Sequence, residues 1–152
     1  MTEPSVIPAI AVAVEVAGAL LFGVAAGSKL RQPGVCRDQL EAYGLLPLAL
    51  TWPVAILIPV VEGFAVVVLP YDAKLGAALA AGLLLLFAAA IGVNLLRGRT
   101  EISCGCGFDA PSRGLSWTLV LRNLAMAGVL GLAAQAPPAR AGAWWLAALA
   151  GA

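Results

Sequence analysis

Two cysteines one residue apart, Cys104 and Cys106, are the residues of this sequence whose type and spacing point most directly to chemistry. They lie in a short polar stretch between two long apolar segments, and Gly105 separates them. A disulfide between positions i and i+2 needs Cα atoms within about 6.8 Å of each other, which a turn at the glycine would provide. Because such a bond would be strained, it would exchange readily. The pair therefore predicts a dithiol–disulfide exchange site.

Neighbouring residues would support this chemistry. Arg97 and Arg99 come a few residues before the cysteines, and their positive charge would stabilise a thiolate. Asn94 lies at the end of the preceding apolar segment, close beneath the same stretch. Cys36, the third cysteine, would relay or resolve a disulfide if it took part, although a lone cysteine is more often a bystander.

Two other interpretations of the cysteine pair stay open. The cysteines are incidental small residues in a glycine-rich loop, or they form a two-coordinate thiolate site for Cu(I). The chain contains no histidine, so four nitrogen or sulfur ligands for zinc are not available. We expect no bound cofactor or resident metal. The net charge of +1 also offers no basic face for nucleic acid.

The composition indicates an integral membrane protein. Of 152 residues, 62% are hydrophobic and 11% are charged, whereas soluble domains have about 45–50% apolar and about 25% charged residues. The apolar segments at about 7–27, 47–69, 74–96 and 115–135 are each long enough to cross a hydrocarbon core of about 30 Å. We therefore predict an all-α fold, a four-helix bundle that crosses the plasma membrane several times.

Two segments lie outside these spans. Ser28 to Gly44 is polar and predicts a loop, and Pro70 to Asp72 predicts a tight turn. Residues 1–136 would form one membrane domain. The tail, 137–152, contains Trp144 and Trp145 in a run too short to span, so we predict that it lies at the membrane interface.

Five polar residues lie within the predicted spans. Ionisable groups in hydrocarbon cost several kcal/mol unless they are paired, so each is a candidate for function or for cross-linking the bundle. We predict that the one arginine pairs with one of the two carboxylates, and the sequence does not choose between them. These residues are Glu15, Glu62, Asn94, Arg122 and Asn123.

The basic residues predict an orientation. Four spans place Cys36 and the cysteine pair on the same side of the membrane. Lys29, Arg31, Arg37, Arg97, Arg99 and Arg113 lie on that side, and Lys74 and Arg140 lie on the other. By the positive-inside rule this asymmetry places the cysteines in the cytoplasm.

Several short motifs occur in an order that resembles the MauE family of methylamine-utilisation membrane proteins, relatives of the DoxX-like four-helix group. They are GSKLR at 27–31, YGLLP at 43–47, PVVEG at 59–63, NLLRGR at 94–99, CGC at 104–106 and LRN at 121–123. The family usually shows CGCFG, whereas this chain has CGCGF, with both cysteines kept.

The resemblance implies an accessory role in maturing methylamine dehydrogenase, with a thioredoxin-like, MauD-like protein as partner. Members of the family also serve other redox pathways. The electron partner in the membrane would be a quinone or another redox molecule. Disulfide supply to exported proteins would place the cysteines outside, against the charge count, whereas relay of reductant from the cytoplasm would agree with it. The rival function class is a structural membrane subunit that recruits soluble enzymes.

Overall fold

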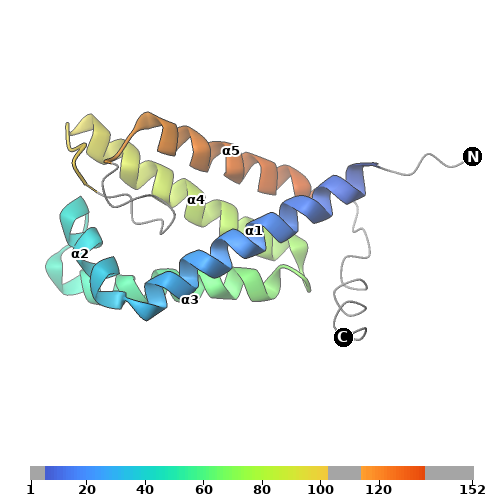
Figure 1. The fold of residues 1–152 in the computed structure, drawn as a ribbon, viewed down its shortest axis with the longest axis horizontal. Coiled ribbons are helices and arrows are strands. Elements are labelled where there is room, and N and C mark those ends of the chain that lie inside the picture. The colour runs from blue at the N-terminus through green and yellow to red at the C-terminus, as the bar shows by residue number, and fades with distance from the viewer. Residues whose placement is uncertain (1–5, 103–113, 136–152) are drawn as a thin grey trace, which may run out of the picture.

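The computed structural model describes residues 6–102 and 114–135, and over these ranges the chain is helical without strands. The helices are α1 (Val6–Arg31), α2 (Pro33–Tyr43), α3 (Leu48–Val68), α4 (Ala73–Leu96) and α5 (Trp117–Ala133). The four longer helices pack against one another along the long axis of the molecule, and the short α2 lies at one end (Figure 1). The predicted all-α class is confirmed.

Two of the described helices, α3 and α4, are long and apolar enough to cross a membrane. α4 consists largely of alanine and leucine, which favour helix strongly. α3 continues through Pro53 and Pro59, each of which removes one backbone hydrogen bond. α5 is a shorter apolar helix.

The polar segment after α1 is helical, so the prediction of a loop from Ser28 to Gly44 is wrong. α1 continues to Arg31, and α2 begins at Pro33, whose fixed φ suits the first turn of a helix. α2 ends at Tyr43, and Gly44, which caps its C-terminus, has a left-handed φ of 61°. The polar composition of this segment led to the prediction of a loop. The segment is a helix, and its buried side chains, Cys36 and Tyr43, face the rest of the protein.

The turn between α3 and α4 is confirmed. Tyr71 and Asp72 donate their backbone N–H groups to the Val68 carbonyl, and the Tyr71 side chain is exposed. The Asp72 carboxylate accepts a hydrogen bond of 3.0 Å from the Leu75 N–H and so caps α4. α4 then passes so close to the end of α3 that a side chain at Gly76 would collide with the Leu69 backbone.

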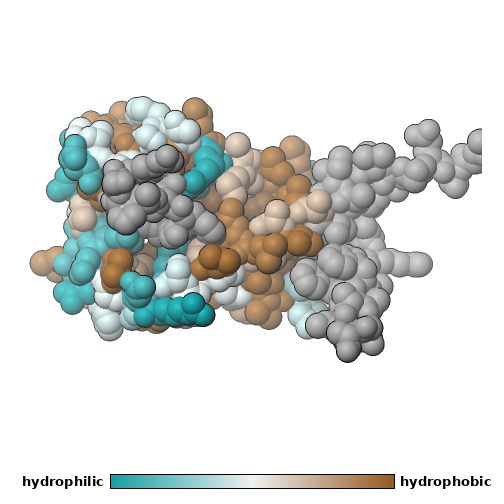
Figure 2. All heavy atoms as spheres, viewed as in Figure 1, coloured by the Kyte–Doolittle hydropathy of each residue, from teal (hydrophilic) through white to brown (hydrophobic). Residues whose placement is uncertain are grey.

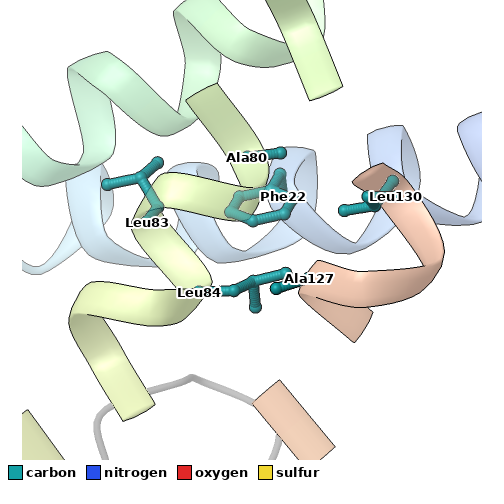
Figure 3. Packing of buried hydrophobic residues seen from close by; sticks show 6 residues of the cluster. All are labelled: Phe22, Ala80, Leu83, Leu84, Ala127 and Leu130. Atoms are coloured by element: carbon teal, nitrogen blue, oxygen red, sulfur yellow. The ribbon is translucent and has the colours of Figure 1, made fainter. Parts of the chain in front are cut away.

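One cluster of buried apolar side chains joins α1, α4 and α5. Figure 3 shows Phe22 of α1 between alanine and leucine side chains of the other two helices, and the small residues let the helices approach closely. The cluster consists of Phe22, Ala80, Leu83, Leu84, Ala127 and Leu130.

The surface is divided along the same long axis. On the face seen in Figure 2, hydrophilic side chains gather over the end that contains α2, and hydrophobic side chains cover much of the remainder that the structure describes. Side chains exposed on the long helices include Leu57, Phe64, Leu86 and Leu121. An apolar exterior of this kind suits contact with lipid.

Candidate functional site

The cysteine pair lies between two stems that the structure holds together. Cys104 and Cys106 themselves, like the tail from 137 to 152, lie outside the described residues. On the two sides of the pair, the Leu115 N–H donates a hydrogen bond of 2.8 Å to the Thr100 carbonyl. Gly114 packs so closely on Thr100 that a side chain there would overlap its carbonyl oxygen. Both ends of the segment are therefore anchored together, at the end of the molecule that carries α2 (Figure 1).

The two arginines before the cysteine pair lie at this anchored end. Arg97 is exposed and follows the last residue of α4. Arg99 Nη1 donates to the carbonyl oxygens of Ala42 and Tyr43, at 3.3 and 3.2 Å. These carbonyls belong to the last turn of α2, where helix carbonyls have no partner within the helix and attract a cation. Arg99 therefore ties α2 to the stem of the cysteine segment.

Cys36 is buried in α2, with 5% of its surface exposed. Its side chain lines a small cavity of about 70 Å³, here called the outer cavity, together with Lys29, Tyr43 and Phe87. Burial raises the pKa of the Cys36 thiol above its ordinary value, and the Lys29 ammonium opposes this shift only in part. At neutral pH Cys36 is therefore a neutral thiol, a poor nucleophile compared with a thiolate.

A buried ion pair lies next to Cys36. The Lys29 ammonium, on the last turn of α1, contacts the Glu62 carboxylate of α3, and the two side chains are 10% and 1% exposed. The same ammonium lies 5.1 Å from the centre of the Phe87 ring, within the range of a cation–π interaction. Glu62 thus has Lys29 as its counter-ion, where the sequence offered Arg122 as the candidate. Of Glu15, the other candidate, the structure describes only the backbone, in α1.

A second cavity of about 100 Å³, here called the inner cavity, lies further along the bundle and shares Lys29 and Phe87 with the outer cavity. Its polar lining consists of the ion pair together with Arg122 and Asn123 of α5. The rest of its wall is apolar, from Leu21, Phe22, Ala25, Leu84, Phe87 and Met126. The structure thus brings three of the predicted intramembrane residues, Glu62, Arg122 and Asn123, to one site.

Asn94 lies elsewhere in the bundle. It is fully buried in α4, its Nδ2 donates to the Ala90 carbonyl at 3.0 Å, and it lines neither cavity. Among the described residues, three buried side-chain atoms have no hydrogen-bond partner: Glu62 Oε2, Asn94 Oδ1 and Asn123 Nδ2. Two of these three atoms belong to residues that line the inner cavity.

A family model described as methylamine utilisation protein MauE matches residues 7–136 of the chain, which is most of its length. The chain belongs to the MauE family. Three relatives, each named methylamine utilization protein MauE, are 43% identical over 127 residues (Paracoccus denitrificans), 41% over 125 residues (Methylorubrum extorquens) and 39% over 127 residues (Paracoccus versutus). These alignments cover 78, 80 and 82% of this chain and 68, 67 and 68% of the relatives. No solved structure is detectably similar.

The resemblance to MauE seen in the short motifs is thus confirmed, but one residue within those motifs was overlooked as a site residue. Lys29 of this MauE-family chain was counted among the basic residues outside the spans, yet its side chain points inward. The signal was Glu62, an acid in an apolar segment that needs a counter-ion, with a lysine at the end of the preceding segment. Among the residues that the structure describes, no three His, Cys, Asp or Glu side chains gather as metal ligands.

Proposed function

We propose that this MauE-family protein is a multi-pass membrane protein that exchanges disulfides through Cys104 and Cys106. The observation that carries the proposal is the pair of thiols one residue apart, on a segment whose two stems are held together by the bond between Leu115 and Thr100. The two stems lie at the end of the molecule that carries α2, and we infer that a soluble partner protein reaches the thiols at this end.

The membrane part of the proposal rests on the helices. α3 and α4 are long and apolar enough to span, and α1 and α5 pack alongside them over much of their length. We infer that all four cross the plasma membrane as a four-helix bundle. α2 and the cysteine segment then lie at one membrane surface, which agrees with the hydrophilic end in Figure 2.

The partner is a thioredoxin-like protein, MauD-like in methylamine utilisation, and the pathway is the maturation of methylamine dehydrogenase. In the exchange, one thiolate of the protein attacks the partner's disulfide and forms a mixed disulfide, which releases one partner thiolate. The second cysteine then attacks the mixed disulfide and releases the other. The protein thereby loses two electrons and two protons, and the partner becomes a dithiol. The reverse sequence oxidises the partner.

The test is a trapping experiment in purified membranes. Cys104→Ser or Cys106→Ser leaves one reactive thiol without its resolving partner. Either variant should form a mixed disulfide with thioredoxin whose second active-site cysteine has been replaced by serine and whose first is disulfide-bonded to a small thiol, which departs as the leaving group. The readout is a band on a non-reducing gel that disappears with reductant.

Cys36 provides the internal control. Because burial raises its pKa, less thiolate is present near neutral pH, so a variant with Cys36 alone should alkylate slowly and form little mixed disulfide. Its alkylation should accelerate as the pH rises toward the raised pKa. If Cys104 and Cys106 stay unreactive and unpaired under oxidising and reducing conditions alike, the exchange proposal fails.

A further inference from the structure

The inner cavity contains unsatisfied hydrogen-bonding atoms of both kinds. Glu62 Oε2 is an acceptor and Asn123 Nδ2 is a donor, and within the described part of the chain neither has a partner. Their residues are 1% and 2% exposed, so bulk water does not readily reach them. A buried polar group without a partner costs about 1–3 kcal/mol, and two of them on one cavity indicate that something polar belongs there.

The size and lining of the inner cavity indicate more than a single water molecule. Its volume of about 100 Å³ exceeds the roughly 10–15 Å³ of cavity volume that one water needs and approaches the roughly 150 Å³ of an apolar cavity that binds benzene. The Phe22 and Phe87 rings and the Met126 thioether provide apolar contacts that a water cluster would not use. These features fit a ring with oxygen substituents.

The ion pair of Lys29 and Glu62 in this site favours an uncharged ligand. Lys29 and Glu62 neutralise each other within hydrogen-bond contact, and the ammonium is further stabilised by the Phe87 ring. A charged ligand would lose its hydration without a vacant counter-ion from this pair. A neutral oxygen that accepts from Asn123 Nδ2, or a hydroxyl that donates to Glu62 Oε2, satisfies the unpartnered atoms without that loss.

The location of the inner cavity allows entry from a membrane. It is lined by α1, α3, α4 and α5, and of these helices α1 and α5 contact each other much less extensively than either contacts its main neighbour. The two helices approach closely near Gly18 and Leu130, where a side chain on the glycine would press against the leucine. From this contact, the cavity lies toward the C-terminal end of α1 and the N-terminal end of α5. It is only partly enclosed. A molecule dissolved in lipid would enter between them.

We propose that the inner cavity binds the head group of a membrane quinone. The geometry selects a neutral, lipid-soluble ring with oxygen substituents, and the choice of a quinone within that class rests on the proposed thiol exchange. A quinone takes up the two electrons and two protons that two thiols release when they form a disulfide, and it becomes the hydroquinone. The quinone oxygen accepts from Asn123, and the hydroquinone hydroxyl donates to Glu62.

The experiment measures binding without thiol chemistry. Purified protein that carries both Cys104→Ser and Cys106→Ser is labelled with a photoreactive azido-ubiquinone of short chain, in competition with decylubiquinone. Labelled peptides should come from α1 between Leu21 and Lys29 and from α5 between Arg122 and Met126. Asn123→Leu removes the donor and should weaken binding about 3- to 10-fold, as expected for one hydrogen bond.

Thr51→Val is the matched control, because Thr51 is also a fully buried polar residue but lines neither cavity. It should leave binding unchanged. Met126→Trp is the second variant, for the case that Asn123→Leu does not fold. The tryptophan fills the cavity from a partly buried position and should abolish labelling. Labelling that is not saturable, that maps to other segments, or that survives both cavity variants overturns the proposal and leaves water as the occupant. If only the trapping experiment fails, the proposed thiol exchange is wrong, but the binding of a ligand in the inner cavity is unaffected.

Discussion

At the scale of single residues, the pair of Lys29 and Glu62 is the most consequential feature of the described structure. A buried ion pair contributes little net stability compared with apolar residues of similar size, but removal of one partner leaves a charge buried alone. The pair joins the last turn of α1 to the second half of α3; both residues line the inner cavity, and Lys29 also lines the outer cavity. The pair therefore links two helices that also pack extensively on each other.

We expect Glu62→Leu to lower the free energy of unfolding by about 3–5 kcal/mol, because the Lys29 ammonium then stays buried without its counter-ion. The double variant Glu62→Leu with Lys29→Met should recover most of this loss. The measurement is a double-mutant cycle on thermal unfolding in detergent.

The control is the pair of Arg37 and Glu41 on α2, whose atoms are 2.6 Å apart but whose side chains are 46% and 29% exposed. Because water screens that pair, Arg37→Ala should cost less than about 1 kcal/mol. Additive losses in the Lys29 and Glu62 cycle, with no recovery in the double variant, would contradict the assignment of this pair.

At the scale of elements, the contact between the end of α3 and the start of α4 depends on a glycine. An added Cβ on Gly76 would lie 2.6 Å from Leu69 Cα and 2.8 Å from Leu69 N, which are backbone atoms that cannot move independently of α3. Gly82, on the same helix, has open space around the same position. Substitution of Gly76 therefore tests close packing between α3 and α4, whereas substitution of Gly82 tests helix propensity alone.

Gly76→Ala should destabilise the protein by about 1–3 kcal/mol, because the methyl group forces the two helices apart. Gly82→Ala should be neutral or stabilising by up to about 1 kcal/mol, because alanine favours helix more than glycine does. Thermal unfolding of both variants in the same detergent gives the comparison. Equal stability of the two variants would mean that α3 and α4 do not pack as described.

At the scale of the whole molecule, the distribution of charge predicts the orientation of the proposed membrane bundle. One of the six basic residues counted on the cysteine side, Lys29, is buried and neutralised by Glu62. The remaining five still exceed the two on the other side, so we still predict from the positive-inside rule that the α2 end faces the cytoplasm. This favours relay of reductant from the cytoplasm over oxidation of exported proteins.

We expect a variant with Cys104 as its only cysteine to resist a membrane-impermeant maleimide in intact cells and to react after permeabilisation. Tyr71→Cys in a background without cysteines is the matched control, because Tyr71 is 88% exposed in the turn at the opposite end of the bundle. That variant should react in intact cells. The reverse pattern would place the cysteine pair outside and support disulfide supply to exported proteins.

The sequence by itself determined the class of this protein. The excess of apolar residues predicts helices for a membrane, and the order of motifs such as NLLRGR at 94–99 and the CGC at 104–106 identifies the family. Both are local properties, because a run of apolar residues or a spaced pair of cysteines is recognised from neighbouring residues alone, without knowledge of how the helices pack. The turn at Pro70–Asp72 was predictable for the same reason.

Only the tertiary structure decided how the polar residues meet. α2 was missed because its composition is polar, and its helix is recognisable through the burial of Cys36 and Tyr43 against other elements. Lys29 pairs with Glu62 because the packing of α1 on α3 brings together residues 33 positions apart. Periodicity shows which face of a helix is apolar, but it does not show which helix covers that face or at what height. The inner cavity, formed by four helices at once, is therefore a property of the packed bundle alone.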